Sequence, residues 1–336
     1  MNDKIYGSLL AAALGDAMGA ATETRSIEQI KEKFGGLVTE ILPIPEDVFA
    51  RGMPLGSVTD DFSLAYETAK AIIDHKGDVD RFCAEDALLN WSKTKYYKMA
   101  GPTTVAAVEK LKGNILPNPY DFLSVDNAKG SNGSAMKISP AGLVAKGNTD
   151  TAIRNAVTIC MPTHANSASL AGACAVSAAI AAALKEDADL DKVFEAGLYG
   201  AMHGEEIGIK MGKRLATPSI PKRMILAREI ALKRKDDMEA CLKELTDIIG
   251  SGLAAAEAVP CAFGILILTG GDPLQSVIGG VNIGNDTDTV ATIAGSIAGA
   301  LNGSAAIPEE YAELIDRANG FDLKKLAEDL ERVAHE

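Results

Sequence analysis

Apolar residues recur along most of this chain at intervals of three and four, which is the spacing of one buried face of an α-helix. Further apolar positions between residues 253 and 268 indicate a buried segment, and a polar amphipathic tail from residue 308 onward is expected to pack on the outside. The pattern predicts helices over residues 4–20, 59–76, 81–93, 103–112, 150–159, 167–184, 236–249 and 290–301.

Three stretches interrupt this pattern. Residues 34–54 are dense in glycine and proline, which predicts a long loop of the kind that often forms a lid or a binding loop. Residues 129–137 form a small-residue loop whose backbone N–H groups and hydroxyls suit an anion, although such a loop is also a common plain turn. A helix break is expected at residues 161–166, which contain a proline.

The composition favours helices over sheets. Hydrophobic residues make up 47% of the 336 residues, many of them alanine, whereas aromatic residues make up only 5%. Small side chains of this kind suit closely packed helices better than sandwiches rich in β-branched and aromatic residues. Because no linker, charge block or repeat divides the chain, we predict one all-α domain over residues 1–336.

The charge balance and the cysteines narrow the classes of partner and compartment. A formal net charge of -13 would repel a phosphate backbone, so the sequence predicts no nucleic-acid partner. The five cysteines are widely spaced and form no Cys-x-x-Cys motif, which favours buried thiols in a reducing compartment. We expect a cytoplasmic protein without a membrane span, since residues 167–184 are dominated by alanine.

Two short acidic segments each precede a predicted helix. The simplest interpretation is that their side chains only cap the helices. If folding brings the two segments together, however, their carboxylates repel each other unless cations neutralise them. An oxygen-only donor set suits Mg²⁺ or Mn²⁺ and is unsuited to structural zinc, and a pair of such ions would support hydrolysis. The donors are Thr59, Asp60, Asp61, Asp286, Asp288 and Thr289.

Five motifs, taken in order along the chain, resemble those of the ADP-ribosylglycohydrolase family, of the dinitrogenase-reductase-activating glycohydrolase type. The match spans nearly the whole chain, and the last motif is the most specific. The motifs occupy residues 14–19 with Glu23, residues 59–61, residues 131–136, residues 163–164 and residues 281–289.

The resemblance implies an all-helical domain with two Mg²⁺ or Mn²⁺ ions at the base of a cleft, held by the six oxygen donors named above. It implies that the ions bind the ribose hydroxyls, that Asp60 or Asp61 orients a water for attack at C1″, and that Glu23 gates the site or assists proton transfer. The implied substrate contacts are Ser131, Asn132, Gly133, Ser134, Met136 and His164. From the residues alone, a structural hydrogen-bonding role for His164 is as well supported as a contact with ligand.

Three positions depart from the family pattern. Asn166 stands where a second histidine is frequent, Lys137 where arginine is common, and Phe62 where threonine is common. The departures leave the metal ligands intact and affect the positions expected near the far end of the substrate. The sequence therefore leaves open an ADP-ribosylated substrate, a smaller free riboside, and a non-catalytic protein like the lens crystallins of this family. It does not indicate the acceptor or the oligomeric state.

Overall fold

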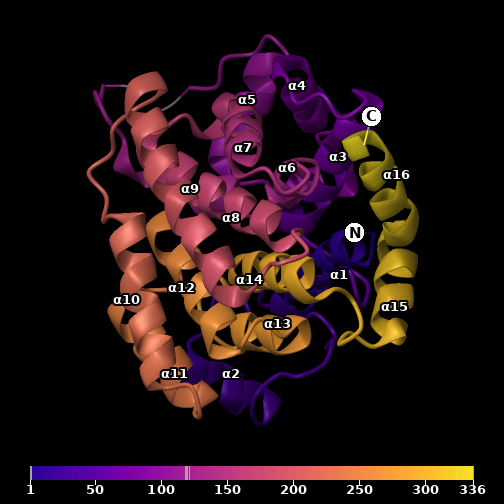
Figure 1. The fold of residues 1–336 in the computed structure, drawn as a ribbon, viewed down its shortest axis with the longest axis vertical. Coiled ribbons are helices and arrows are strands. Elements are labelled where there is room, and N and C mark those ends of the chain that lie inside the picture. The colour runs from indigo at the N-terminus through magenta and orange to yellow at the C-terminus, as the bar shows by residue number, and fades with distance from the viewer. Residues whose placement is uncertain (1, 118–119, 121, 336) are drawn as a thin grey trace.

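The computed structural model describes residues 2–117, 120 and 122–335. In this part of the chain every regular element is helical, apart from the isolated β-bridges Ser131–Ala254 and Asn166–Lys213. Figure 1 shows one compact bundle, so the predicted all-α domain is confirmed. The α-helices are α1 (Asn2–Gly19), α2 (Ile27–Phe34), α3 (Asp60–Asp74), α4 (Arg81–Trp91), α5 (Pro102–Leu111), α6 (Ser139–Leu143), α7 (Thr149–His164), α8 (Ser167–Ala183), α9 (Leu190–Met211), α10 (Ile220–Lys233), α11 (Met238–Ile248), α12 (Ala255–Leu268), α13 (Pro273–Val281), α14 (Thr287–Asn302), α15 (Glu309–Asn319) and α16 (Leu323–His335). Three 3₁₀ helices are η1 (Lys95–Met99), η2 (Asn127–Lys129) and η3 (Asn132–Ser134).

Helix α8 forms the centre of the bundle. All of its residues are buried, and it packs against α6, α7, α9, α12 and α14 (Figure 1). Helix α9 approaches it closely because Gly200 and Gly204 face its backbone. A Cβ atom on Gly200 would lie 2.3 Å from the carbonyl oxygen of Cys174. The alanine-rich segment predicted to be a core helix is thus the core, and small residues set the spacing around it.

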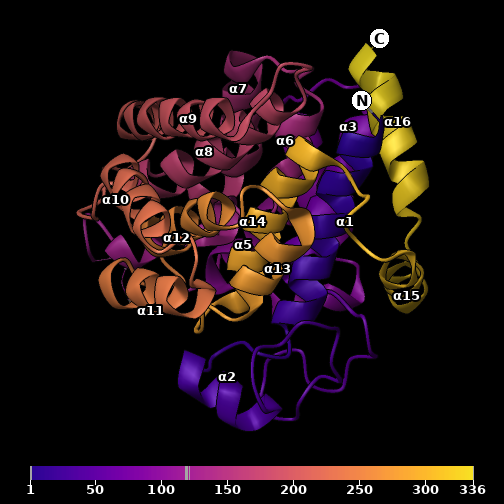
Figure 2. The same ribbon diagram turned by 60° about the horizontal axis from the view of Figure 1, so that its bottom comes forward.

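Helices α1 and α14 lie side by side in both ribbon views (Figures 1 and 2). Their glycines allow backbone contact, since a Cβ atom on Gly15 would lie 2.5 Å from the carbonyl carbon of Ala291. One turn further along, a Cβ atom on Gly19 would lie 2.4 Å from the Cα atom of Asp288. The pairing therefore brings the end of α1 against the acidic start of α14.

The outer elements complete the bundle. Helices α15 and α16 run along one edge, as expected for the polar tail, and α10 and α11 lie on the opposite side (Figure 1). The predicted loop over residues 34–54 begins at Phe34, the last residue of α2, and contains no further helix. No helix in the described ranges is both long and apolar enough to cross a bilayer. All five cysteines are buried and unpaired, as expected.

The predicted helix break at residues 161–166 is shorter than expected, because only Ala165 and Asn166 separate α7 from α8. Helix α7 continues through Pro162 and ends at His164. A proline removes one backbone N–H donor, so the carbonyl oxygen four residues earlier in α7 loses its usual helical partner while the helix continues. The continuation carries Thr163 and His164 on the last turn of α7, directly before α8.

Candidate metal centre and active site

The start of α3 is held by a carboxylate from another helix. Asp16 of α1 is fully buried, and its Oδ1 accepts a hydrogen bond of 2.8 Å from the backbone N–H of Thr59. Its Oδ2 accepts a second bond of 2.8 Å from the backbone N–H of Phe62. Thr59 is the N-cap, and its hydroxyl accepts the N–H of Asp61 at 3.3 Å.

These contacts decide between the two interpretations of the first acidic segment. Because Asp16 and Thr59 satisfy the first N–H groups of α3, the capping interpretation of Asp60 and Asp61 is wrong. Asp286 is the N-cap residue of α14, yet its side chain makes no capping hydrogen bond. In the second segment, Oδ1 of Asp288 accepts the backbone N–H of Thr289 at 3.1 Å, so capping leaves Asp60, Asp61 and Asp286 available for another role.

Folding brings the two acidic segments together, as the sequence predicts. The hydroxyl of Thr289 in α14 donates a 2.6 Å hydrogen bond to Oδ2 of Asp61 in α3. All of these residues are buried except Asp60, which is partly exposed and marks the side that faces solvent.

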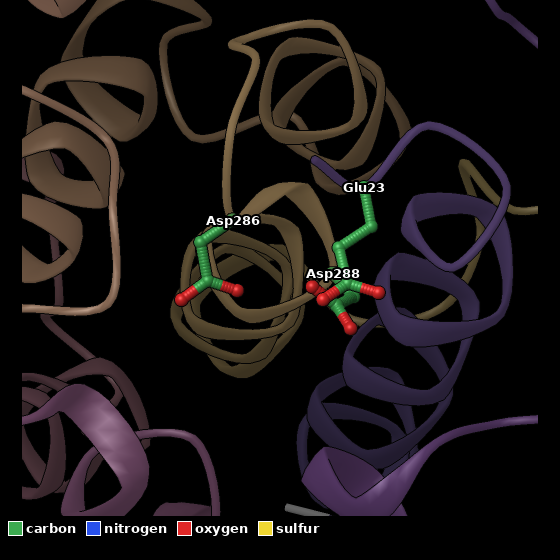
Figure 3. Close-up of side chains that lie close together, drawn as sticks. All are labelled: Glu23, Asp286 and Asp288. Carbon is green, nitrogen blue, oxygen red and sulfur yellow. The ribbon is translucent and has the colours of Figure 1, made fainter. Parts of the chain in front are cut away.

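Glu23 joins this group from the turn after α1. One carboxylate oxygen each from Glu23, Asp286 and Asp288 lies within 4.8 Å of the others, and all three residues are buried. Figure 3 shows the side chain of Glu23 reaching down to Asp288, with Asp286 beside them on the first turn of α14. Three carboxylates at this spacing offer oxygen atoms that could share a cation.

Burial and mutual repulsion shift the acids strongly. Burial, followed by the charges of Asp286 and Asp60, raises the pKa of Glu23 to about 8. Burial and the charge of Asp16 raise the pKa of Asp60 to about 8. For Asp61 and Asp288, burial is again the main cause and holds the pKa well above the ordinary range of a carboxyl.

The nearest arginine does not neutralise this cluster. Arg25 lowers the pKa of Glu23 only as the smallest contribution, since its guanidinium pairs with Asp47 at 2.5 Å. Its other nitrogen, Nη1, donates to the carbonyl oxygens of Ala21 and Glu23. Arg25 therefore holds the turn that carries Glu23 and links it to the loop that follows α2. A cavity of about 480 Å³ adjoins this turn and is lined by Thr24, Arg25, Gln29, Glu32, Lys33 and Asp47.

The predicted substrate loop contacts the same group at one point. The side-chain amide of Asn132 donates a 2.5 Å hydrogen bond to Oδ2 of Asp286. This contact orients the carboxylate and also lowers the pKa of Asp286, against the larger effect of burial, which raises it. Asn132 thus connects the loop at residues 131–136 to the acidic cluster, in addition to its predicted contact with substrate.

The other loop residues divide into two sets. Ser131 and Gly133 are partly exposed, and the Ser131 hydroxyl lies 3.0 Å from Nε2 of the buried His164. Ser134 and Met136 are buried, and the Ser134 hydroxyl donates to the carbonyl oxygen of Ser169 at 2.8 Å. The side chain of Ser131 is therefore partly accessible, whereas Ser134 is fully buried and its hydroxyl is used within the fold.

Sequence reasoning missed the roles of three residues that organise this site. Asp16 was recognised only as an acid between glycines, and the roles of Arg25 and Asp47 were not predicted. The partners of Asp16 are 43 and 46 residues away in the chain, so no local pattern reveals them. A usable signal was that the motifs contain three acids, Asp16, Asp60 and Asp61, although the start of α3 needs only one capping side chain.

Comparison with known proteins identifies the family. A sequence model of the family described as ADP-ribosylglycohydrolase matches residues 1–336. The chain belongs to the ADP-ribosylglycohydrolase family.

The matches to individual relatives span nearly the full length of both proteins. An uncharacterized protein, YegU of Escherichia coli K12, is 28% identical and covers 97% of this chain and 95% of its own. ADP-ribosylhydrolase ARH3 of Homo sapiens is 26% identical and covers 98% and 93%. The solved structure of an ADP-ribosylglycohydrolase-related protein complex superposes with a TM-score of 0.64 at 22% identity, covering 99% and 98%, and shares the fold.

In this member of the family, the three residues that depart from the expected pattern are all buried. Asn166 caps α8 by accepting the N–H of Ser169 at 2.8 Å. Phe62 is fully buried and packs edge-on against Phe321 at 6.0 Å between ring centres. Lys137 is 1% exposed and lies behind the loop at residues 131–136. None of the three belongs to the acidic cluster.

Proposed function

We propose that the chain is a Mg²⁺- or Mn²⁺-dependent glycosyl hydrolase that cleaves the ribose C1″ bond of an ADP-ribosylated substrate. The supporting observation is the buried cluster of carboxylates, in which Asp16 and Thr59 cap α3 in place of Asp60 and Asp61 and the side chain of Asp286 does not cap α14. Family membership supports the reaction class, and the net charge of -13 disfavours nucleic acid as substrate.

The chemistry of the donor set fits hard divalent cations. Every donor is a carboxylate or hydroxyl oxygen, which Mg²⁺ and Mn²⁺ prefer and structural zinc does not. Buried acids that repel one another, as their raised pKa values indicate, are stabilised when cations bind. The residues proposed to hold the ions are Thr59, Asp60, Asp61, Asp286, Asp288 and Thr289. When bound, divalent cations of this kind lower the pKa of water and polarise substrate oxygens.

The protein's own groups would divide the remaining work. Asp60 or Asp61 would orient the attacking water and accept its proton as the C1″ bond breaks through an oxocarbenium-like state. Glu23 has a pKa of about 8 and can hold a proton at its carboxyl near neutral pH. In proton transfer, Glu23 would donate this proton to the leaving group. In gating, the proton would be gained or lost as the turn that carries Glu23 moves over the site.

The loop at residues 131–136 would bind the distal part of the substrate. Ser131 and Gly133 are partly exposed, and the Ser131 hydroxyl contacts Nε2 of the buried His164. A smaller free riboside would use the acidic cluster without these contacts, so its turnover would be insensitive to changes at Ser131.

The test combines a substrate panel with one ligand variant. The Mg²⁺-loaded protein is incubated with ADP-ribosyl-arginine, O-acetyl-ADP-ribose and a set of nucleosides, and the released sugar is quantified with and without EDTA. We expect cleavage of an ADP-ribosyl bond that EDTA abolishes. Cleavage only of nucleosides would favour the smaller substrate, and cleavage of none would refute the enzyme.

Asp288→Ala should lose both calorimetric Mg²⁺ binding and turnover, by more than about 100-fold. Even outer partners of metal ligands contribute 10–100-fold to metal affinity or activity. Asp78→Ala is the matched control, because Asp78 is exposed and far from the cluster in the sequence. Full metal-dependent turnover by Asp288→Ala would show that the ligand assignment is wrong.

A further inference from the structure

Lys137 is a buried lysine that the proposed reaction does not use. Its side chain is 1% exposed, and Nζ donates a 3.0 Å hydrogen bond to the hydroxyl oxygen of Thr163 on the last turn of α7. Within the described part of the chain Lys137 forms no ion pair with a carboxylate, and burial lowers its pKa. A buried amine with one hydroxyl partner needs an explanation, because burying it is costly.

The hydrogen bonds continue from Thr163 to the substrate loop. The Thr163 hydroxyl lies 2.7 Å from Nδ1 of His164, and Nε2 of the same ring lies 3.0 Å from the Ser131 hydroxyl. The Ser131 hydroxyl makes no other hydrogen bond to the described residues. Lys137, Thr163, His164 and Ser131 therefore form one continuous hydrogen-bond chain from the interior to the partly exposed loop.

The direction of this chain follows from the donors and acceptors available. An ammonium group only donates, so the Thr163 oxygen accepts from Lys137 and keeps one hydrogen to give. Its possible acceptors are Nδ1 of His164 at 2.7 Å and the carbonyl oxygen of Cys160 at 3.4 Å. The shorter contact is the better hydrogen bond, which makes Nδ1 an acceptor.

The state of the imidazole then fixes the role of Ser131. Burial, aided by the charge of Lys137, lowers the pKa of His164 to about 3, so the ring is neutral at physiological pH. A neutral ring with an acceptor at Nδ1 carries its proton on Nε2. Nε2 therefore donates to the Ser131 oxygen, and the hydrogen of the Ser131 hydroxyl remains free.

We propose that Lys137 and Thr163 are positioning residues that fix the Nε2–H tautomer of His164, so that Ser131 presents a hydrogen-bond donor to an oxygen of the substrate. The tautomer stands on the geometry alone, whereas the contact with substrate rests on the proposed function. The donor would select an acceptor-only group, such as a phosphate or carboxylate oxygen, at the distal end of the substrate.

Gly133 supports this arrangement by leaving room for the ring. A Cβ atom there would lie 3.1 Å from Nε2 and 3.2 Å from Cε1 of His164. Such a contact is tighter than usual and would push the imidazole away from Ser131. The small residue and the hydrogen-bond chain thus hold the ring in one place.

The tautomer is measured directly by long-range ¹H–¹⁵N NMR of the full chain labelled with ¹⁵N-histidine, free of substrate. The protein has four histidines, and the His164 signals are those missing from His164→Gln. We expect the wild-type ring to carry its proton on Nε2 only. In Lys137→Met the Thr163 hydroxyl can turn to the Cys160 carbonyl and accept from the ring, so an Nδ1–H population should appear. Lys137→Arg should restore the wild-type spectrum.

A wild-type His164 protonated on Nδ1 would overturn the proposal, and this outcome requires no variant to fold. Identical spectra for wild type and a folded Lys137→Met would also overturn it. Failure of the hydrolase assay leaves the spectra unchanged, so the proposed function and the tautomer fail separately.

The kinetic consequence is a change in KM with little change in kcat. Ser131 lies away from the reacting bond, and the loss of one hydrogen bond corresponds to a rise of about two- to tenfold in KM. Lys137→Met should show this rise toward the ADP-ribosyl substrate, and Lys137→Arg should reverse it. If Lys137 had a purely structural role, Lys137→Met would instead lower kcat and the stability of the fold together. The His164 spectrum would not change.

Discussion

Without metal, the protein should lose stability as the pH rises toward 8. A carboxyl whose pKa is raised by folding holds its proton more tightly in the folded chain than in the unfolded chain. For Glu23 the ordinary value is 4.5 and the folded value is about 8. The stabilisation from this proton is complete below the unfolded pKa and is lost as the pH rises through the folded pKa.

The size of the effect follows from proton linkage. For one carboxyl with a folded pKa of about 8, the free energy of unfolding falls by ~1.5 kcal/mol between pH 6.5 and pH 8. A chain of this length has an unfolding entropy of ~0.7 kcal/mol per kelvin, so each such carboxyl lowers Tm by ~2 °C over this interval. Asp60, whose pKa is also about 8, acts in the same direction.

The assay is thermal unfolding followed by circular dichroism in EDTA, with Glu23→Gln as the decisive variant. The variant removes one titrating group and relieves repulsion on Asp288, so its Tm should fall by at least ~2 °C less than that of wild type over the same interval. Glu186→Gln removes an exposed glutamate and should follow wild type.

Saturating Mg²⁺ should reverse the trend. Cations bind the deprotonated carboxylates, and a ligand at 100 times its Kd adds ~2.7 kcal/mol of stability. If wild type and Glu23→Gln show parallel pH dependence in EDTA, Glu23 does not hold its proton in the fold and the electrostatic reasoning is refuted.

Two further variants test how the site is positioned. Asp16→Asn leaves one of two buried N–H groups at the start of α3 unpaired, which should lower the free energy of unfolding by ~2–3 kcal/mol and Tm by ~3–4 °C. It should also weaken Mg²⁺ binding measured by calorimetry. An unchanged Tm would show that α3 does not depend on this cap. Gly19→Ala places a Cβ atom 2.4 Å from the Asp288 backbone and should cost ~1–3 kcal/mol or more, whereas Gly101→Ala has open space and serves as the control; equal Tm values would contradict the close packing of α1 on α14.

The sequence predicts the core and the meeting of the two acidic segments for a clear physical reason. Runs of alanine and periodic apolar residues leave few alternatives to buried helices, as at α8 and α14. The acids stand out because each helix start carries more carboxylates than one cap requires. These signals are local, so they can be read from a single sequence.

Other helices were not predicted because their signals are weak or conflicting. Helix α9 contains four glycines that face α8 or its neighbours, and glycine lowers helix propensity. Helix α2 is short, although its capping box of Ser26 and Gln29 was a readable start signal. Pro162 indicated a break where tertiary packing continues α7 by one more turn.

The sequence predicts that the two acidic segments meet, but not which atoms pair, because the contacts join distant parts of the chain. The amide of Asn132 reaches Asp286 across 154 residues, and Thr289 reaches Asp61 across 228. Such pairs depend on how α1, α14 and the loop after α5 pack. A single sequence contains the chemical types of these residues but no information on which of them become neighbours.

The assignment of caps links the stability of this protein to its proposed chemistry. Asp16 and Thr59 satisfy the backbone at the start of α3, so the carboxylates of Asp60 and Asp61 are not needed as caps of this helix. Buried carboxylates of this kind destabilise a fold unless protons or cations neutralise them. Protons neutralise them at low pH, and the proposed divalent cations would do so at neutral pH. The same repulsion that weakens the metal-free protein would therefore favour the proposed metal-bound state.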